Sequence, residues 1–277
     1  MNIIADSSST RTQWTITDGR RIVESAVTSE LNPFFLTRRE ISHIIRLELP
    51  EVFFRRRWKH IYFYGAGCAN PDKNKIVSSS LVAQFKTPAT VESDMLGAAR
   101  GLWVRKRGLA CILSTGANAC IYDGEKIEQN TVPGGYILGD EGSNAYLGKL
   151  LVSDVIKLLA PKELINAFYT RFNTNINEIM DLIYSHPHAN RTLATYSEFL
   201  AENIHHPYCH DMVYRGFKDF FARNFAAFGK PDLPLGFVGK TGVRYRSILE
   251  KAASEHGFVI EKIIPDSMPG LIEYHAD

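Results

Sequence analysis

The sequence has few cysteines and no long apolar run, and both shortages exclude classes of protein. Its four cysteines are scattered and form no Cys-x-x-Cys pair: Cys68, Cys111, Cys120 and Cys209. We therefore expect no disulfide framework, but free and mostly buried thiols in a reducing cytoplasm. No apolar stretch approaches the roughly 20 residues that cross a bilayer. Residues 1–6 also lack the charged and apolar regions of a signal peptide.

The sequence also lacks an excess of charge of either sign, since it has 32 Lys and Arg and 30 Asp and Glu, a formal net charge of +2. This balance gives no electrostatic reason to expect a nucleic acid or a membrane surface as a partner. The 277 residues, 45% of them apolar, are enough for one large domain or two medium ones with an ordinary hydrophobic core.

One pattern of strand, polar loop and strand occurs twice along the chain. In the first copy, a buried strand at 3–5 leads into the polar loop 6–12, and a strand with alternating apolar residues follows near 14–16. The Asp18-Gly19 pair is a signal for a tight hairpin. Residues 21–25 then return as a third strand.

In the second copy, the apolar run 109–113 leads into the small, polar loop 114–118 and the short strand 119–121. Asp123-Gly124 marks the hairpin, and residues 125–128 return. The copies are roughly a hundred residues apart, which is too far for the repeat of a solenoid and favours two related domains. Coincidence is the alternative, because strand–loop–strand patterns are common.

Helical and extended segments alternate along the rest of the chain, an order typical of α/β proteins. We expect further strands at 61–64, 90–91, 235–238 and 258–263. We expect helices at 71–85, 95–104, 144–159, 161–172, 176–184, 193–204, 208–228, 245–256 and 269–275.

A domain boundary is expected in the gap 105–108, which is charged and ends in glycine. Residues 1–106 would then form the first domain, and residues 107–266 the second. The C-terminal segment 267–277 can join the first domain as a helix.

The two loops rich in Ser, Thr and Gly can aim backbone N–H groups and hydroxyls at phosphate oxygens. Each loop alone is weak evidence, because small residues also make ordinary tight turns. Together, loops 6–12 and 114–118 fit a pair of phosphate loops that face each other across a cleft. Asp6 opens the first loop at the end of a strand, where a carboxylate suits Mg²⁺ bound with phosphates and waters.

Segment 133–143 is the most informative part of the sequence, because glycines and acids crowd into it. Glycine lets the backbone approach a ligand closely, and Asp140 can accept hydrogen bonds from two sugar hydroxyls. The alternative is a flexible turn before a helix that is capped by Glu141 or Ser143.

Asp94 also has two interpretations. A phosphoryl-transfer enzyme needs a carboxylate that orients the attacking hydroxyl and accepts its proton. The alternative is an aspartate that caps the helix expected at 95–104.

Three other motifs do not meet the requirements of the sites that they suggest. Gly239-Lys240-Thr241 is not a P-loop, because Pro234 stands where that motif needs glycine. Gly65-x-Gly67 continues to Asn70, where a dinucleotide fingerprint needs glycine or alanine. The histidines between 205 and 210 lack the glutamate of a zincin motif, so we expect no metal site there.

In this order, the motifs resemble those of the N-acetylglucosamine kinase-like proteins, a group that includes the BadF/BadG/BcrA/BcrD ATPases of the sugar kinase–actin–Hsp70 superfamily. Residues 6–12 resemble the first phosphate loop, usually Asp-Gly-Gly-Gly-Thr-Lys-Thr, and 114–118 resemble the second, usually Gly-Thr-Gly-Ser-Asn. Residues 134–148 match the group's Gly-Gly…Gly-Asp-Glu-Gly-Ser…Leu-Gly segment, and 236–242 stand where its adenosine loop belongs. The resemblance covers nearly the whole chain.

The resemblance implies an α/β fold of two RNase-H-like domains with a nucleotide cleft between them and a large helical insertion in the second. The first domain would supply the sugar side and the first phosphate loop, and the second domain the second phosphate loop and the adenosine loop. Asp94 would be the catalytic base, and Asp6 would bind Mg²⁺ through water. The residues implied to bind the sugar are Asn32, Thr115, Gly135, Asp140 and Asn144. Those implied to bind ATP are Asp6, Ser8, Ser9, Thr10, Arg11, Thr12, Thr115, Gly116, Gly236 and Gly239.

The first loop departs from the family pattern, because Ser7, Ser8 and Ser9 replace three glycines and Arg11 replaces lysine. Serine adds bulk where a phosphate approaches, although its hydroxyl can donate a hydrogen bond.

The function implied is ATP-dependent phosphorylation of an amino sugar, with the 6-OH of N-acetylglucosamine or a related N-acetylhexosamine as the acceptor. One alternative is an ATPase activator of a radical dehydratase, whose iron–sulfur cluster needs cysteines that are not suitably spaced here. Another is a non-catalytic sugar sensor that kept the fold, against which Asp94 and Asp140 argue. A cytoplasmic homodimer is the expectation that the family provides, and the sequence does not rank the amino sugars.

Overall fold

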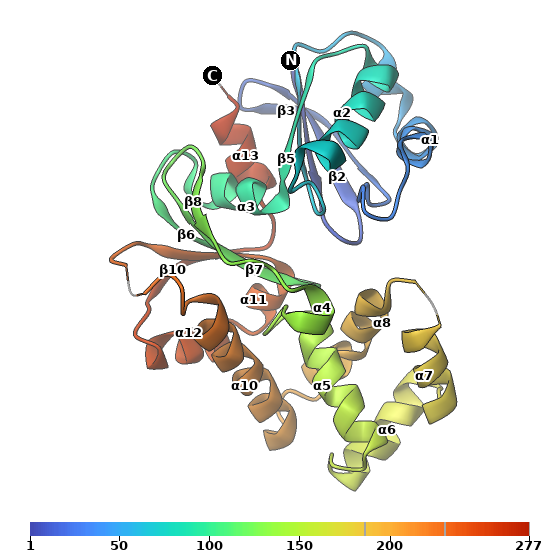
Figure 1. Cartoon of the computed structure of the whole chain (residues 1–277), viewed down its shortest axis with the longest axis vertical. Coiled ribbons are helices and arrows are strands. Elements are labelled where there is room, and N and C mark those ends of the chain that lie inside the picture. The colour runs from blue at the N-terminus through green and yellow to red at the C-terminus, as the bar shows by residue number, and fades with distance from the viewer. Residues whose placement is uncertain (186, 230, 277) are drawn as a thin grey trace. The chain divides into compact units, whose positions relative to one another are not determined.

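The computed structural model describes residues 1–185, 187–229 and 231–276, and the chain divides into two compact units (Figure 1). Unit 1 comprises Met1–Gly108, Tyr122–Glu128 and the C-terminal residues from Asp266 on. Unit 2 comprises Leu109–Ile121 and Gln129–Pro265. The chain forms two five-stranded sheets accompanied by helices, so the predicted α/β class is confirmed.

The sheet of unit 1 has the strand order β3-β2-β1-β4-β5. β2 pairs antiparallel with both β1 and β3, whereas β1, β4 and β5 run parallel to one another. Parallel neighbours end at the same edge of a sheet, so the loops that follow these three strands leave it together. The strands are β1 Asn2–Ser7, β2 Thr12–Asp18, β3 Arg21–Thr28, β4 Ile61–Gly65 and β5 Ala89–Ser93.

The second sheet has the strand order β10-β9-β6-β7-β8. Its connectivity is the same as that of the first sheet, with β6 in the central place of β1. β9 runs parallel to both of its neighbours, β6 and β10. The predicted repeat of strand, loop and strand is therefore confirmed as two sheets of one topology. The strands are β6 Gly108–Leu113, β7 Ala117–Tyr122, β8 Ile127–Asn130, β9 Leu235–Val238 and β10 Ile260–Ile264.

The helices of unit 1 form two pairs, because α1 packs on α2 and α13 packs on α3 (Figure 1). α1 was not predicted, although its start carries a sequence signal. Thr37 and Glu40 form a capping box, in which each side chain accepts from the backbone N–H of the other. The elements are α1 Arg38–Glu48, the 3-10 turn η1 Glu51–Phe54, α2 Pro71–Phe85, α3 Asp94–Trp103 and α13 Met268–Tyr274.

The chain between β8 and β9 is largely helical, as predicted, and forms the insertion of unit 2. The single helix predicted at 193–204 is wrong, because the chain breaks at Ser197, whose hydroxyl donates to Ala194 O (2.7 Å). The helices are α4 Gly135–Leu138, α5 Asn144–Ile156, α6 Lys162–Phe172, α7 Ile176–Tyr184, α8 Ala189–Tyr196, α9 Glu198–Glu202 and α10 Pro207–Asn224. After β9 follow α11 Lys240–Arg244 and α12 Arg246–Glu255.

Each unit has its own aromatic core. In unit 1, Trp14 of β2 packs against Phe63 and Phe85, with ring centroids 6.2 and 6.1 Å apart. In unit 2, Phe221 of α10 packs on Phe237 of β9 at 6.1 Å. Burying rings of this size is a large part of core stability. The four cysteines are free and buried, as predicted. Among the described residues, we find no helix with the length and apolar character that crossing a bilayer requires.

α3 and α13 cross with their backbones in contact. A Cβ on Gly101 would lie 2.7 Å from Ser267 Cβ and 2.8 Å from the Ser267 carbonyl oxygen. A Cβ on Gly270 would overlap the carbonyl group of Gly101. These separations are too short for real side chains, so the crossing needs glycine on both helices. It fixes the start of α13 against α3, the helix that begins at Asp94.

Gly101→Ala tests this crossing, because two effects of opposite sign compete. Helix propensity alone would stabilise the protein by about 1 kcal/mol. We expect instead a loss of about 1–3 kcal/mol in the free energy of unfolding, because the added methyl overpacks the crossing. Urea unfolding followed by circular dichroism measures the change. Ser79→Ala, at a half-buried position of α2, is the control, and a Gly101→Ala protein more stable than wild type would contradict the close packing.

Candidate active site

The first predicted phosphate loop is the turn between β1 and β2. Ser8 N donates to Arg11 O (2.9 Å), which closes the turn. The Ser8 hydroxyl donates to the same carbonyl (3.1 Å) and accepts from the N–H groups of Thr10 and Arg11 (3.4 Å each). These two N–H groups converge on one point, as they would on an anion oxygen. Thr10 and Arg11 are exposed, and Ser9 is half-buried.

Ser7 and Thr12, at the two ends of this loop, are buried and hold it to the rest of unit 1. Their hydroxyl oxygens lie 2.8 Å apart. Ser7 Oγ accepts from Leu31 N (3.1 Å), and the Thr12 hydroxyl donates to Ser29 O (3.0 Å). The Thr12 side chain therefore has its partners inside the protein, and this placement does not support the predicted phosphate contact. Ser7 supplies an anchor that a glycine would lack.

Asp6 and Asp94 lie at the same edge of the sheet of unit 1. The parallel register pairs Ser7 of β1 with Gly65 of β4, and Gly65 with Ser93 of β5. The ends of the three strands are therefore in line. Asp6 is the last residue but one of β1, and Asp94 follows β5 directly as the first residue of α3.

The N-cap of α3 is Ser93, so the interpretation of Asp94 as the cap is wrong. Ser93 Oγ accepts from Leu96 N (3.2 Å). Asp94 Oδ1 accepts from the neighbouring Met95 N (2.9 Å). Helix capping thus does not explain why an aspartate stands at this position.

Asp266 and Ser267, which were not predicted, complete the surroundings of Asp6. They connect β10 to α13 and belong to unit 1. Ser267 lies near enough to the Asp6 carboxylate to lower its pKa, and the charges of Asp94 and Asp266 raise that pKa. No local pattern could have found these residues, because they are about as far from Asp6 in sequence as the chain allows.

The electrostatics of Asp6 follow from this environment. Burial raises the pKa of Asp6 from 3.8 to about 7, and the charges of Asp94 and Asp266 add to the increase. The nearby Ser267 side chain and the charge of Arg11 lower the pKa of Asp6. Unit 1 therefore gathers carboxylates at this edge with too little positive charge to balance them, an arrangement that a bound cation would stabilise.

Asn32, predicted to bind the sugar, is 8% exposed in the segment between β3 and α1. Its Oδ1 accepts from Phe34 N (2.9 Å) in an Asx turn. Gly67, with φ +83°, passes so close that a Cβ would overlap this oxygen. The carboxamide is therefore held in one orientation. Within the described residues its Nδ2 makes no hydrogen bond, so this group can still donate.

The loop after β4 links Asn32 to Asp94. Gly67 contacts the Asn32 side chain, and its neighbour Cys68 lies close enough to Asp94 to feel its charge. Burial, and then the Asp94 charge, raise the pKa of the Cys68 thiol to about 12. This loop, which does not qualify as a dinucleotide motif, thus lies between two predicted site residues of unit 1.

The second predicted phosphate loop, Ser114 to Gly116, connects β6 and β7. Ser114 N donates to Gly116 O (3.0 Å). The N–H groups of Asn144 and Ala145, at the start of α5, donate to Ser114 O (2.9 Å) and Thr115 O (3.1 Å). The position of the loop is therefore set by the first turn of α5, which directly follows the Gly-Asp-Glu-Gly-Ser segment.

Asp140 lies against this loop. Its Oδ1 accepts from Ala117 N (3.1 Å), and a Cβ on Gly116 would come within 3.1 Å of the same oxygen. The backbone of Asp140 is left-handed (φ 58°), which aspartate tolerates better than most residues. Burial and the charge of Glu141 raise the pKa of Asp140, while the Ala117 N–H and the Lys149 charge lower it. Within the described chain, Oδ2 makes no hydrogen bond.

The other residues of this segment have structural partners. Glu141, 7% exposed, accepts from Asn224 Nδ2 (3.4 Å) and pairs with Arg223 (3.5 Å) at the end of α10. Gly142 (φ +75°) lies where a Cβ would meet Phe220 Cβ at 3.1 Å. Ser143 caps α5, with Oγ accepting from Tyr146 N (3.1 Å), as one interpretation of the sequence predicted.

Asn144 and Gly239 join three loops of unit 2. Asn144 Oδ1 accepts from the Thr241 hydroxyl (3.1 Å), which also reaches Ser114 O (3.4 Å). Gly239 (φ +131°) leaves no room for a Cβ, which would overlap Leu113 O. The predicted contact of Asn144 with an N-acetyl group stays a prediction, since its side-chain oxygen is engaged within unit 2.

Two predicted residues are placed away from these loops. Gly236 lies inside β9, paired with Ala110 of β6 and Lys262 of β10, so it is not part of the loop that follows the strand. Gly135 (φ +63°) is exposed at the start of α4, and no atom lies within 4 Å of a Cβ built there. Neither position supports the predicted ligand contact.

One histidine just before α10 has a structural use. His206 caps that helix, with Nδ1 accepting from Tyr208 N (3.2 Å). In the part of the chain that the structure describes, no three His, Cys, Asp or Glu side chains converge to hold a metal ion directly. Any cation at Asp6 would therefore need other ligands, such as water and phosphate.

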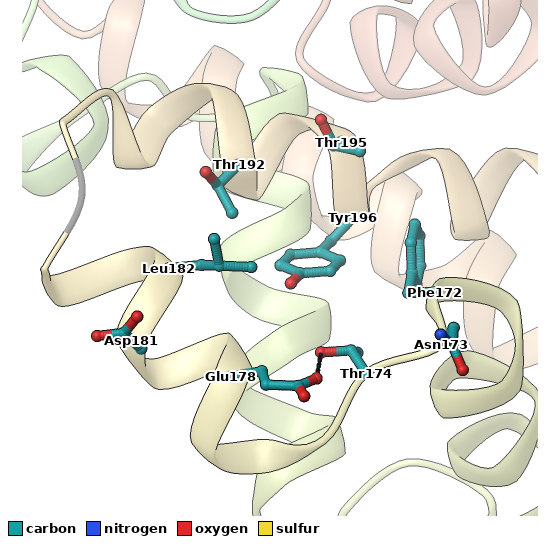
Figure 2. A pocket seen from close by; sticks show the side chains of 9 residues that line it. All are labelled: Phe172, Asn173, Thr174, Glu178, Asp181, Leu182, Thr192, Thr195 and Tyr196. Atoms are coloured by element: carbon teal, nitrogen blue, oxygen red, sulfur yellow. Dashed lines mark hydrogen bonds between the residues drawn. The ribbon is translucent and has the colours of Figure 1, made fainter.

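A cavity of about 540 Å³ lies among α6, α7 and α8 of unit 2, walled in part by Phe172, Leu182 and Tyr196 (Figure 2). None of the predicted site residues is among its described lining residues. The Glu178 carboxylate in its wall accepts from the Thr174 hydroxyl (3.1 Å) and completes the capping box of α7. These structural bonds account for Glu178, and the predicted chemistry lies elsewhere.

No family model and no curated protein matches the sequence. A solved structure from Porphyromonas gingivalis, provisionally named an N-acetylglucosamine kinase, is 37% identical, with a TM-score of 0.95 over 100% of this chain and 99% of that chain.

Two more distant structures share the fold. One from Chromobacterium violaceum, also provisionally named an N-acetylglucosamine kinase, has 16% identity and a TM-score of 0.74, covering 99% of this chain and 98% of that chain. A ROK-family transcriptional regulator, a homologue of the E. coli MLC protein, has 11% identity and a TM-score of 0.64, covering 99% and 78%. At such identities the likeness concerns the fold alone. The full-length match at 37% identity shows that this chain belongs to the N-acetylglucosamine kinase-like family of the sugar kinase–actin–Hsp70 superfamily.

Proposed function

We propose that this protein is an ATP-dependent sugar kinase that phosphorylates a hydroxyl of an amino sugar, the 6-OH of N-acetylglucosamine or a related N-acetylhexosamine. The observation that carries the proposal is the juxtaposition of Asp94 and Asp6 at one edge of the sheet of unit 1. This reaction needs one carboxylate that acts as a base on the alcohol and a second carboxylate at a phosphate loop. The name of the 37% identical relative supports the same activity.

Asp94 is the base in this proposal. It accepts the proton of the sugar hydroxyl as the oxygen attacks the γ-phosphorus of ATP. The Nδ2 of Asn32 donates to a sugar oxygen, and the Oδ2 of Asp140 accepts from a sugar hydroxyl. Both side chains are held by a hydrogen bond to their other atom, Oδ1, so their orientation is set before the sugar arrives.

The loops supply the contacts to the nucleotide. The converging N–H groups of Thr10 and Arg11 bind a phosphate oxygen, which displaces the Ser8 hydroxyl that accepts from them in this structure. Ser9, Thr115 and Gly116 contribute from the two loops, and the turn at Gly239 would contact the nucleoside. We assign the first phosphate loop and the base to unit 1 and the other two loops to unit 2.

Mg²⁺ fits the carboxylate edge of unit 1. Burial is the main cause of the raised pKa of Asp6, and the negative charges of Asp94 and Asp266 add to the increase while Arg11 opposes it. Carboxylate oxygens suit Mg²⁺, which keeps several waters and binds phosphates as its other ligands. Asp6 would hold the ion through water, and the ion would neutralise charge that develops on the transferring phosphoryl group.

The two alternatives have weaker support. An activator of a radical dehydratase would need cysteines exposed to hold an iron–sulfur cluster, and all four cysteines are buried. Burial raises the pKa of the Cys120 and Cys209 thiols to about 12 and about 11, which disfavours the thiolate. A non-catalytic sensor has no need of an aspartate at position 94, where capping does not explain it.

A coupled assay of ADP release over a set of amino sugars tests the activity. We expect turnover with at least one N-acetylhexosamine. Asp94→Asn should lower kcat by about 10²-fold or more, because the base is lost while the hydrogen-bonding shape is kept. Thermal unfolding should be close to wild type. Turnover unchanged in Asp94→Asn would remove this residue from its role, and no turnover by wild type on any of the sugars would refute the proposal.

Asp140 and Glu141 are neighbours with different expected roles, and substituting each separates them. Asp140→Asn should raise the KM for the sugar about 10-fold or more, with little change in the melting temperature, because an acceptor for a sugar hydroxyl is lost. Glu141→Gln should lower the melting temperature, because it weakens the buried contacts to α10. Steady-state kinetics and calorimetry measure both. The reverse pattern would show that the two roles are assigned to the wrong residues.

The raised pKa of Asp6 makes stability depend on pH. Between about pH 4 and pH 7 the folded protein binds the Asp6 proton more tightly than the unfolded chain, so the free energy of unfolding falls as pH rises through this window. The full effect above pH 7 is at most about 4 kcal/mol. In EDTA, Asp6→Asn should therefore be more stable than wild type at pH 8, and the difference should shrink toward pH 4. Asp72→Asn, at an exposed position of α2, is the control, and a pH-independent difference would contradict the assignment.

A further inference from the structure

The Ser8 hydroxyl occupies the point of the first phosphate loop that the proposed function gives to a phosphate oxygen. Its Oγ accepts from the backbone N–H groups of Thr10 and Arg11, at 3.4 Å each. It also lies 3.3 Å from the hydroxyl oxygen of Thr10. Thr10 and Arg11 were both predicted to bind ATP, so a side chain of the protein already holds groups that the nucleotide would need.

An oxygen at this point is what a phosphate would supply. Successive N–H groups that converge form a concavity that binds anions. A hydroxyl oxygen can fill such a concavity, because it accepts hydrogen bonds as a phosphate oxygen does, but it lacks the negative charge that strengthens them. The two N–H bonds to Ser8 Oγ are also long for hydrogen bonds of this type. A phosphate can therefore displace the hydroxyl, but part of its binding free energy offsets that displacement.

The loop does not need this hydroxyl to keep its shape. Ser8 N donates to Arg11 O at 2.9 Å, which closes the turn through backbone atoms alone. At the two ends of the loop, the Ser7 and Thr12 side chains are buried and bonded to backbone groups of the segment after β3. Removing the Ser8 hydroxyl would therefore free the two N–H groups without opening the turn that aims them.

We propose that Ser8 is an autoinhibitory residue, whose hydroxyl competes with the nucleotide for the phosphate loop and so lowers the affinity of the protein for ATP and ADP. Glycine, the usual residue at this position in the family, has no hydroxyl that could compete. The inference rests on the part of the proposed function that assigns a phosphate to this loop. It reverses the predicted role of Ser8, from a ligand of ATP to a competitor of it, and it does not depend on which sugar accepts the phosphoryl group.

Isothermal titration calorimetry with ADP tests the inference without turnover. The apparent affinity is reduced to the fraction of molecules in which the two N–H groups are free. We expect Ser8→Ala to bind ADP about 3- to 10-fold more tightly than wild type, because a neutral hydrogen bond changes an equilibrium by about this factor. Ser8→Gly should also bind more tightly, but with a smaller gain, because glycine makes the unbound loop more flexible.

Ser78→Ala is the matched control. Ser78 is half-buried, as Ser8 is, and its hydroxyl donates to Lys75 O at 3.3 Å, much as the Ser8 hydroxyl donates to Arg11 O at 3.1 Å. Ser78 lies within α2, outside both predicted phosphate loops. The affinity of Ser78→Ala for ADP should therefore stay as in wild type.

Hydrogen exchange of the loop amides, followed by NMR, measures whether the hydroxyl occupies the loop. Without nucleotide, the amides of Thr10 and Arg11 should exchange faster in Ser8→Ala than in wild type, after correction for the change in sequence, because they lose their acceptor. With saturating ADP the rates in the two proteins should agree, since a phosphate oxygen then accepts from the same amides in both.

Each outcome decides the matter. Tighter binding of ADP by Ser8→Ala, together with faster exchange in its unbound loop, supports the inference. An affinity that is unchanged or weaker in Ser8→Ala would overturn it, as would unchanged exchange rates or a wild type that binds no ADP. If wild type binds ADP, Ser8→Ala binds it more tightly and neither phosphorylates an amino sugar, the proposed function fails and the inference on Ser8 stands. If wild type phosphorylates an amino sugar and Ser8→Ala binds ADP no more tightly, the inference alone fails.

Discussion

The parallel register of β1, β4 and β5 is the constraint on which the site of unit 1 depends. It sets Ser7, Gly65 and Ser93 in line, so the residues next to them, Asp6 and Asp94, leave the sheet at one edge. A slip of one residue would turn every side chain of a strand to the opposite face. The buried packing of aromatic rings on β2 and β4 prevents this slip, so the hydrophobic core indirectly determines which acids meet.

The same register creates an electrostatic cost. Carboxylates that are desolvated side by side destabilise one another, and Asp6 shows this as a raised pKa. These carboxylates beside a loop with converging N–H groups fit a site that is completed by a cation and phosphates, for which the unbalanced charge is favourable.

Much of this arrangement could be predicted from the sequence, because local patterns encode it. The strand–loop–strand repeat, the helix cap at Asn70 and the cap at Ser143 all depend on residues within a few positions of each other. α1 was missed although the Thr37–Glu40 capping box was present. The roles of Asp266 and Ser267 could not be predicted, because they arise only when α13 packs on α3. Thr12 and Gly236 were predicted to bind ligands from motif position alone. Strand pairing and burial determine their surroundings, and these do not support the predicted contacts.

The Gly-Asp-Glu-Gly-Ser segment shows why a family motif is not the same as a binding site. The density of glycines suggested close approach to a ligand, but Gly142 packs on Phe220, and Gly148 of the same motif packs on the Leu193 carbonyl. Glu141 and Ser143 hold α10 and α5 in place. Asp140 alone of these keeps a carboxylate oxygen without a protein partner in the described chain. The motif identifies the family mainly through residues that build its fold, so the choice of sugar has to be argued from Asp140 and Asn32, the side chains that the fold orients but does not fully satisfy.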